Sequence, residues 1–118
     1  MIFKTANGKW LTKALFYETS VILEEGGTRQ FARYTTKEED HEADGIVYKS
    51  LRKLFLSCED PTEYEFATTY LGGWSHWKAL QKVKDFEGMI DGWRDEYSVK
   101  LRSIGVQKII EIAKDEGG

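Results

Sequence analysis

The clearest hydrophobic pattern lies in the second half of the chain. Apolar residues there recur at spacings of three and four, which place them on one face of a helix. The pattern predicts a helix of about five turns whose apolar stripe comprises Phe86, Ile90, Trp93, Tyr97, Leu101 and Ile104. Gly105 is expected to end this helix. One further amphipathic helix is then predicted from Val106, Ile109, Ile110 and Ala113.

Two short helices joined by a glycine pair are predicted between residues 60 and 83. Asp60 is a suitable cap for the first helix, Pro61 fits its first turn, and Glu63 occupies the position of a capping-box acid. The expected apolar face comprises Tyr64, Ala67, Tyr70 and Leu71. Gly72 can adopt the left-handed conformation that ends a helix.

The second of these helices is predicted to be capped by Ser75 and to have two unlike faces. Its apolar face comprises Trp74, Trp77, Leu80 and Val83. Its basic face comprises Lys78, Lys82 and Lys84. A helix, a tight turn and a second helix form the helix-turn-helix motif, although antiparallel helical hairpins in ordinary bundles share this arrangement.

The first half of the chain has the alternation and turn residues of short strands. Asn7-Gly8 predicts a β-hairpin, and residues 21–23 and 31–36 have the composition of further strands in a small antiparallel sheet. Residues 37–44 are rich in acids and predict a solvated loop, closed by a turn at Asp44-Gly45. Residues 46–48 are expected to pair back onto residues 31–35. Ser50 is a suitable cap for a helix over residues 51–58 in which Leu51, Leu54 and Phe55 face inward.

These elements predict an α+β fold. A small antiparallel β-hairpin region, residues 1–48, precedes a mainly helical region, residues 49–118, with the helix-turn-helix-like segment at 60–84. The length of 118 residues and the 41% hydrophobic content suit a single compact domain with one core.

Charge and cysteine usage narrow the class of protein. A net charge of −3 argues against binding nucleic acid through bulk charge, although a local basic face remains possible. Cys58 is the single cysteine, so an intramolecular disulfide is excluded and a reducing cytoplasm is expected. No secretory pattern or membrane span is indicated. The abrupt end after an amphipathic helix suggests a truncated chain or a missing C-terminal region.

Polar residues do not converge in the way that an enzyme requires, so we predict no catalytic residues, no metal and no cofactor. His41, His76 and Cys58 lack metal-ligand spacing, and structural or surface roles are favoured for the two histidines. Cys58 is expected to be an inert, small core residue. The acidic loop lacks the glycine and ligand order of a calcium site.

The tryptophans and the cations each allow two interpretations. Trp74, Trp77 and Trp93 can meet in the core, or they can stack on bases or on a partner. The lysines at 78, 82 and 84 form a local basic face for phosphates, which Arg94, Lys100, Arg102 and Lys108 can extend. Acids interleave with that second group, so a solvated helix of mixed charge explains it about as well.

The segment PTEYEFATTYLGGWSHWKAL, followed by MIDGWRDEYSVKLRSIGVQKIIEIAKDE, resembles the small terminase subunits that package DNA in tailed bacteriophages. In that family a helix-turn-helix built around an F-x-x-x-Y-L segment, here Phe66 to Leu71, precedes longer assembly helices. The resemblance covers about the second half of the chain. It implies a non-catalytic subunit in the host cell cytoplasm that forms a homo-oligomeric ring, binds double-stranded DNA and delivers it to the large terminase subunit.

A rival hypothesis comes from a different class of protein. The chain would be a small modulator that docks on a host or viral enzyme through exposed aromatic residues and the acidic loop, without binding DNA. The negative net charge favours this rival slightly. The DNA-packaging adaptor should form a large oligomer and shift duplex DNA, whereas the modulator should ignore DNA.

Overall fold

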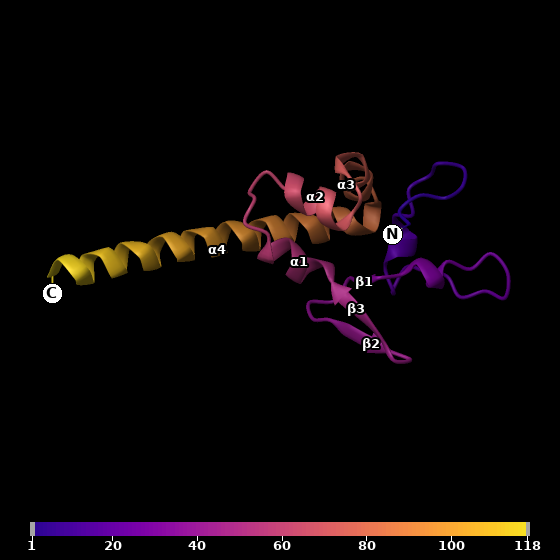
Figure 1. Cartoon of the computed structure of the whole chain (residues 1–118), viewed down its shortest axis with the longest axis horizontal. Coiled ribbons are helices and arrows are strands. Elements are labelled where there is room, and N and C mark those ends of the chain that lie inside the picture. Colours follow the sequence, from indigo (N-terminus) through magenta and orange to yellow (C-terminus); the bar gives the residue numbers. More distant parts are fainter. Residues whose placement is uncertain (1, 118) are drawn as a thin grey trace.

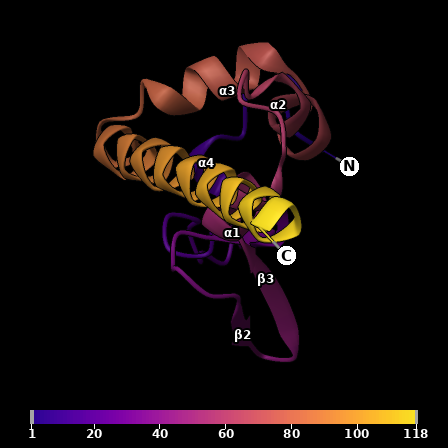
Figure 2. The same ribbon diagram turned by 90° about the vertical axis from the view of Figure 1, so that its left-hand side faces the viewer.

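Three short helices pack against the first half of a long one (Figure 1). The computed structural model describes the backbone of residues 2–117 and the side chains of residues 2–110. The helices are α1 (Leu51–Ser57), α2 (Tyr64–Tyr70), α3 (Trp74–Gln81) and α4 (Lys84–Gly117). Figure 2 shows α2 and α3 on one side of α4, with α1 and the sheet on the other.

The core forms where these helices meet. Phe55 of α1 lies at its centre, with its ring centroid within 6.1 Å of the rings of Phe66, Trp77 and Trp93. The predicted stripe of α4 is confirmed over its first turns, because Phe86, Ile90 and Trp93 are buried. The first half of the chain joins the same core through Leu11, Leu15 and Phe16, whose ring lies 4.8 Å from that of Phe86.

A small mixed sheet precedes the helices, so the predicted α+β class is confirmed. Its strands are β1 (Tyr34–Thr35), β2 (His41–Ala43) and β3 (Ile46–Ser50), in the order β1-β3-β2. The strands β2 and β3 form an antiparallel hairpin through Asp44 and Gly45, which both have positive φ as a type I′ turn requires. The expected pairing of residues 46–48 onto residues 31–35 was wrong, because residues 46–48 pair with β2. Only residues 49–50 pair with residues 34–35, and that pairing is parallel.

Several details of the first half differ from the sequence-based expectation. Asn7-Gly8 makes the predicted turn, but the hairpin contains only the isolated bridge between Lys4 and Trp10. The following segment forms a 3-10 helix, η1 (Lys13–Leu15), which turns Leu15 and Phe16 into the core. A second 3-10 helix, η2 (Arg29–Phe31), occupies part of the segment expected as strand. Residues 21–23 form an exposed loop, and β2 lies in the segment expected as a solvated loop.

The N-terminal ends of the helices also differ in part from the sequence-based expectation. Ser50 caps α1 as predicted, and its Oγ accepts a hydrogen bond from Lys53 N at 3.3 Å. The helix α2 begins at Tyr64, later than expected, although Asp60 Oδ2 still accepts a bond from Glu65 N at 3.1 Å. Glu63 is the cap residue without a capping-box contact, and Gly73 rather than Ser75 caps α3. Gly72, with φ of +77°, ends the α2 segment as predicted.

The helix α4 runs without interruption through Gly105, so the expected break there was wrong. A glycine costs a helix about 1 kcal/mol, too little to end one that continues on both sides. From Ser98 to Ile110 every side chain is exposed, and this outer part of α4 extends away from the rest of the chain (Figure 1). The exposed side chains include Val99, Leu101, Ile104, Val106, Ile109 and Ile110. In the part of the chain that the structure describes, no helix has the length and apolar content needed to cross a membrane.

Candidate nucleic-acid interface

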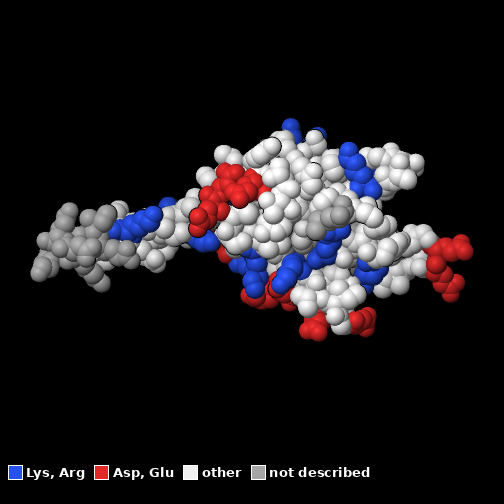
Figure 3. All heavy atoms as spheres, viewed as in Figure 1, with Lys and Arg blue, Asp and Glu red and all other residues white. Residues whose placement is uncertain are grey.

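The predicted basic face lies at the corner between α3 and α4. Lys78, Lys82 and Lys84 are all exposed. Within the described residues none of the three forms an ion pair with an acid. Figure 3 shows basic side chains over α3 at the top of the molecule. These lysines are therefore free to contact phosphates.

Trp74 belongs to this surface and not to the core. It is the first residue of α3 and 40% exposed, one helical turn before Lys78 and so on the same face. The ring of Tyr64, itself 60% exposed, lies 6.4 Å from the Trp74 ring. The expectation that both residues lie on apolar core faces was wrong. The expectation was correct for Trp77 and Trp93, which are 0% and 4% exposed.

Arg94 is engaged in a network that joins three helices. Its Nε and Nη2 donate to the Glu63 carboxylate at 2.8 and 2.9 Å, and Nη2 also donates to Gln81 Oε1 at 2.7 Å. Trp77 Nε1 donates to the same carboxylate at 3.1 Å. The hydrogen bond to Glu63 raises the pKa of Arg94 further above its usual range. This guanidinium orients α3 on α4 and has little capacity left for a phosphate.

Lys100 and Arg102 lie apart from the α3 lysines. Both are exposed on the outer part of α4, 16 or more residues beyond Lys84, which corresponds to roughly 24 Å of helix. Lys100 Nζ donates to Leu56 O at 2.6 Å and so ties α4 to the end of α1. The structure thus places Trp74, Lys78 and Lys82 at successive helical turns, with the exposed Lys84 at the start of α4. It does not bring the other predicted cations to that surface.

His76 and Cys58 have structural surroundings. His76 is fully buried, stacks on Trp10 with ring centroids 4.6 Å apart, and donates from Nδ1 to Leu71 O at 2.8 Å. Burial lowers the pKa of this imidazole. Cys58 is half-buried, and burial raises the pKa of its thiol, which disfavours the reactive thiolate.

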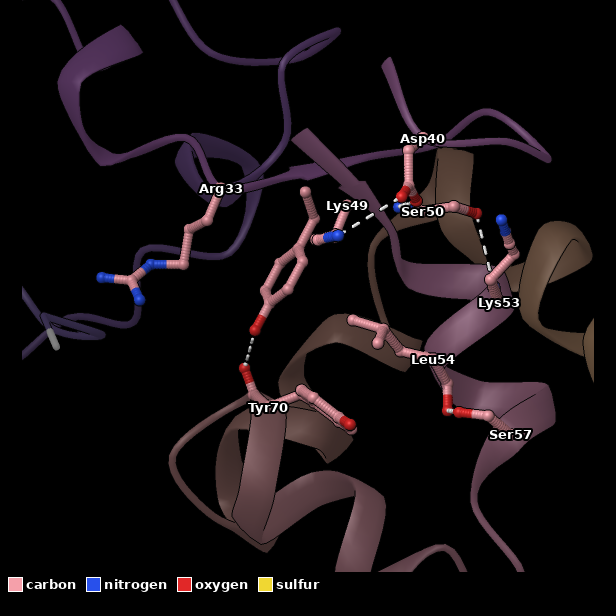
Figure 4. A pocket seen from close by; sticks show the side chains of 9 residues that line it. Arg33, Asp40, Lys49, Ser50, Lys53, Leu54, Ser57 and Tyr70 are labelled. Carbon is pink, nitrogen blue, oxygen red and sulfur yellow. Dashed lines mark hydrogen bonds and ion pairs between the residues drawn. The ribbon is translucent and has the colours of Figure 1, made fainter. Parts of the chain in front are cut away.

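A second surface feature is a cavity of about 570 Å³ between the sheet and helices α1 and α2 (Figure 4). Its walls include Tyr34, Leu54 and Tyr70, and its rim carries cations on both sides. Tyr34 Oη donates to Tyr70 O at 2.6 Å, and burial raises the pKa of Tyr34 to about 12. Sequence patterns did not indicate this cavity, because its lining comes from segments that are distant in the chain.

The acidic segment before β3 has a structural contact beside this cavity. Asp40 Oδ1 accepts a hydrogen bond from the buried Ser50 N at 2.8 Å, and Lys49 lies 3.5 Å from the same carboxylate. These contacts lower the pKa of Asp40. Asp40 is exposed, as expected for this segment, and its hydrogen bond also fixes the junction between β3 and α1.

Comparison with known proteins gives no further constraint. The chain matches no protein-family model, and neither curated proteins nor solved structures give a significant match.

Proposed function

We propose that this protein is a non-catalytic DNA-packaging adaptor of the small terminase type. The observation that supports this proposal most is the α3 surface formed by Trp74, Lys78, Lys82 and Lys84. Trp74 and Lys78 lie on the second helix of a helix-turn-helix-like pair, the element that such motifs place against DNA, and Lys82 and Lys84 follow at its C-terminal end. Unpaired lysines suit phosphates, and an exposed aromatic ring adds a flat apolar contact.

The outer part of α4 is the proposed surface for protein partners. It exposes Val99, Leu101 and Ile104, among others, along a helix that contacts the end of α1 through Lys100. An exposed apolar surface of this kind marks a site of protein contact. In the adaptor it would bind the large motor and nuclease subunit, and further copies of the chain would complete a homo-oligomer.

Salt dependence of DNA binding tests the α3 surface. If the three lysines neutralise phosphates, the plot of log affinity against log salt should have a slope of roughly −2 to −3 from these residues alone, at about −0.9 per phosphate. The triple variant Lys78→Gln, Lys82→Gln, Lys84→Gln should lose that part of the slope and keep its fold. Fluorescence anisotropy of a labelled duplex at several salt concentrations measures both quantities.

A matched control removes three exposed lysines elsewhere. The variant Lys9→Gln, Lys13→Gln, Lys37→Gln changes the net charge by the same amount, and all three residues lie in the first half of the chain. It should bind duplex DNA nearly as the natural chain does. An unchanged affinity and slope in the α3 variant, or an equal loss in the control, would exclude α3 as the DNA surface.

The second candidate function is a protein-binding modulator that ignores DNA. The exposed apolar residues of α4 favour it, because they support protein contact whether or not α3 binds DNA. The exposed pair Tyr64 and Trp74 would then dock on protein. The modulator predicts no duplex binding at low salt and a one-to-one complex with an enzyme.

A further inference from the structure

The loop over residues 21–28 presents three consecutive apolar side chains to solvent. Val21, Ile22 and Leu23 are 46%, 72% and 61% exposed. Figure 1 shows this loop at the end of the molecule opposite to the C-terminal end of α4. Single exposed apolar residues are ordinary, but three in a row at a loop tip indicate a contact surface. We name residues 21–25 the apolar tip.

The apolar tip is held in a fixed shape by its base. Val21 N donates to Thr28 Oγ1 at 2.8 Å, and Thr28 N donates back to Val21 O at 2.8 Å. Arg29 ties the base to the preceding turn through Ser20 Oγ at 2.6 Å. A side chain at Gly27 would lie 2.9 Å from Leu23 N, so glycine permits the close return of the loop. A preformed loop loses less entropy when it binds.

The cavity of Figure 4 has the properties of a receptor for such a tip. Its volume of about 570 Å³ is in the range of ligand pockets. Tyr34, Leu54 and Tyr70 supply apolar walls, and the rim carries Arg33, Lys49 and Lys53. Lys49 pairs with Asp40 at 3.5 Å and Lys53 with Glu39 at 3.0 Å, whereas Arg33 has no ion pair within the described residues. Within the described residues the buried Nε of Arg33 has no hydrogen-bond acceptor. The cavity therefore fits an apolar group that is followed by acids.

The apolar tip has this chemistry. Glu24 and Glu25 follow Leu23 directly, and both are exposed. The acidic side chains at the right-hand end of Figure 3 lie over this loop. Within one chain the tip remains exposed and the cavity remains open, so the two do not meet each other. We propose that the apolar tip of one copy inserts into the cavity of a second copy, with Glu24 and Glu25 facing Arg33.

This contact joins two different surfaces, so it is head-to-tail. Each copy then keeps one free tip or one free cavity, and addition of copies continues until a ring closes or a filament forms. The contact does not require DNA binding by α3. It assigns to residues of the first half of the chain the assembly that the adaptor needs.

Disulfide trapping tests the contact independently of any association through α4. In a Cys58→Ser background, one chain carries Ile22→Cys in the tip and a second carries Ser57→Cys at the cavity. Under mild oxidation the mixture should give a disulfide-linked heterodimer in at least roughly tenfold greater yield than a mixture of Ile46→Cys and Ser57→Cys, because paired surfaces raise the local thiol concentration. Ile46 is similarly exposed, at 53%, and lies on β3.

Reversing the charge of the two acids in the tip provides a second test in the same disulfide-trapping experiment. Glu24→Lys with Glu25→Lys in the Ile22→Cys chain should lower the heterodimer yield by roughly tenfold, since like charges then face each other. Equal yields from the Ile22→Cys and Ile46→Cys mixtures would overturn the proposal. Preferential pairing of Ile22→Cys with itself would do the same, because it would indicate contact between two tips. Either result leaves the DNA-binding test of α3 unaffected.

Discussion

Glu63 and Arg94, which are 31 residues apart in the sequence, form a bidentate ion pair. Arg94 Nε donates to Glu63 Oε2 at 2.8 Å and Nη2 donates to Oε1 at 2.9 Å. The same carboxylate accepts the indole N–H of Trp77, so one acid fixes α2, α3 and α4 together. Glu63 reaches this position with φ of +70°, a left-handed conformation that is unfavourable for a residue with a side chain. The contacts of the carboxylate therefore offset a strained backbone.

Two substitutions at Glu63 should separate these effects. Glu63→Ala should destabilise the fold by about 2 kcal/mol, because hydrogen bonds to a charged group are lost and Trp77 Nε1 is left without a partner. Glu63→Gly loses the same contacts but relieves the positive φ, so it should be about 1 kcal/mol more stable than Glu63→Ala. Urea denaturation measures both. A glycine variant no more stable than the alanine variant would contradict the left-handed conformation.

Trp74 and Trp77 should respond in opposite ways to truncation. Trp74→Ala should change stability by less than about 1 kcal/mol, as expected for a surface position, and should weaken duplex DNA binding. Trp77→Ala should cost about 3 to 5 kcal/mol, because it leaves a cavity in the core. Thermal unfolding and anisotropy titration, run on both variants, give the comparison. Large destabilisation by Trp74→Ala would place its ring in the core after all.

Glycine-to-alanine substitutions should have opposite signs at two positions. Gly72 has φ of +77°, and an added Cβ would lie 2.6 Å from the Phe3 ring, so Gly72→Ala should destabilise by more than about 1 kcal/mol. Gly92 is in α4 with open space around it, so Gly92→Ala should stabilise by about 1 kcal/mol. Chemical denaturation of the two variants checks both signs, and destabilisation by Gly92→Ala would indicate that its surface is covered.

Stability should fall in mildly acidic solution because of His76. Its pKa is lowered in the folded chain, so the unfolded chain binds the proton more readily. Stability is therefore fully present above the unfolded pKa of about 6.5 and is lost as the pH falls below that value. Carboxyl groups with a lowered pKa, such as Asp60, add a separate loss only near pH 4 and below.

The variant His76→Gln isolates this contribution. It cannot titrate, so its free energy of unfolding should change little between pH 7.5 and pH 5, although it will be less stable than the natural chain at pH 7.5. Urea denaturation at both pH values gives the two differences. Equal pH dependence in the variant and the natural chain would assign the effect to another group.

Periodicity succeeded where helices bury one face along their length. Phe86, Ile90 and Trp93 were identifiable because α4 packs on neighbours over those turns. It failed at helix starts, since a shift of a few residues changes which side chains the first turn presents. Tyr64 and Trp74 each begin a helix and so lie at its exposed end, whereas Phe66, absent from the expected face, is buried.

The strands could not be predicted from hydrophobic periodicity, for a different reason. The strand β2 lies in an acid-rich segment without alternation. The strand β3 buries Tyr48 and Ser50 but leaves Ile46 and Val47 exposed, so its apolar residues do not mark its buried face. Only Asp44-Gly45 indicates the hairpin, through its backbone preference. The Glu63–Arg94 pair and the lining of the cavity have no local signature either, because each depends on how separate elements pack.

The packing of the first turns of α4 in the core also fixes the orientation of its outer part. Phe86, Ile90 and Trp93 hold the helix in the core against rotation, so the side chains of residues 98–110 point in set directions relative to the α3 lysines. That outer part extends about 20 Å beyond Tyr97 at 1.5 Å per residue. Inserting one residue after Tyr97 would turn it by about 100°. A protein bound to residues 98–110 is thus held at a fixed distance and angle from any DNA bound at α3.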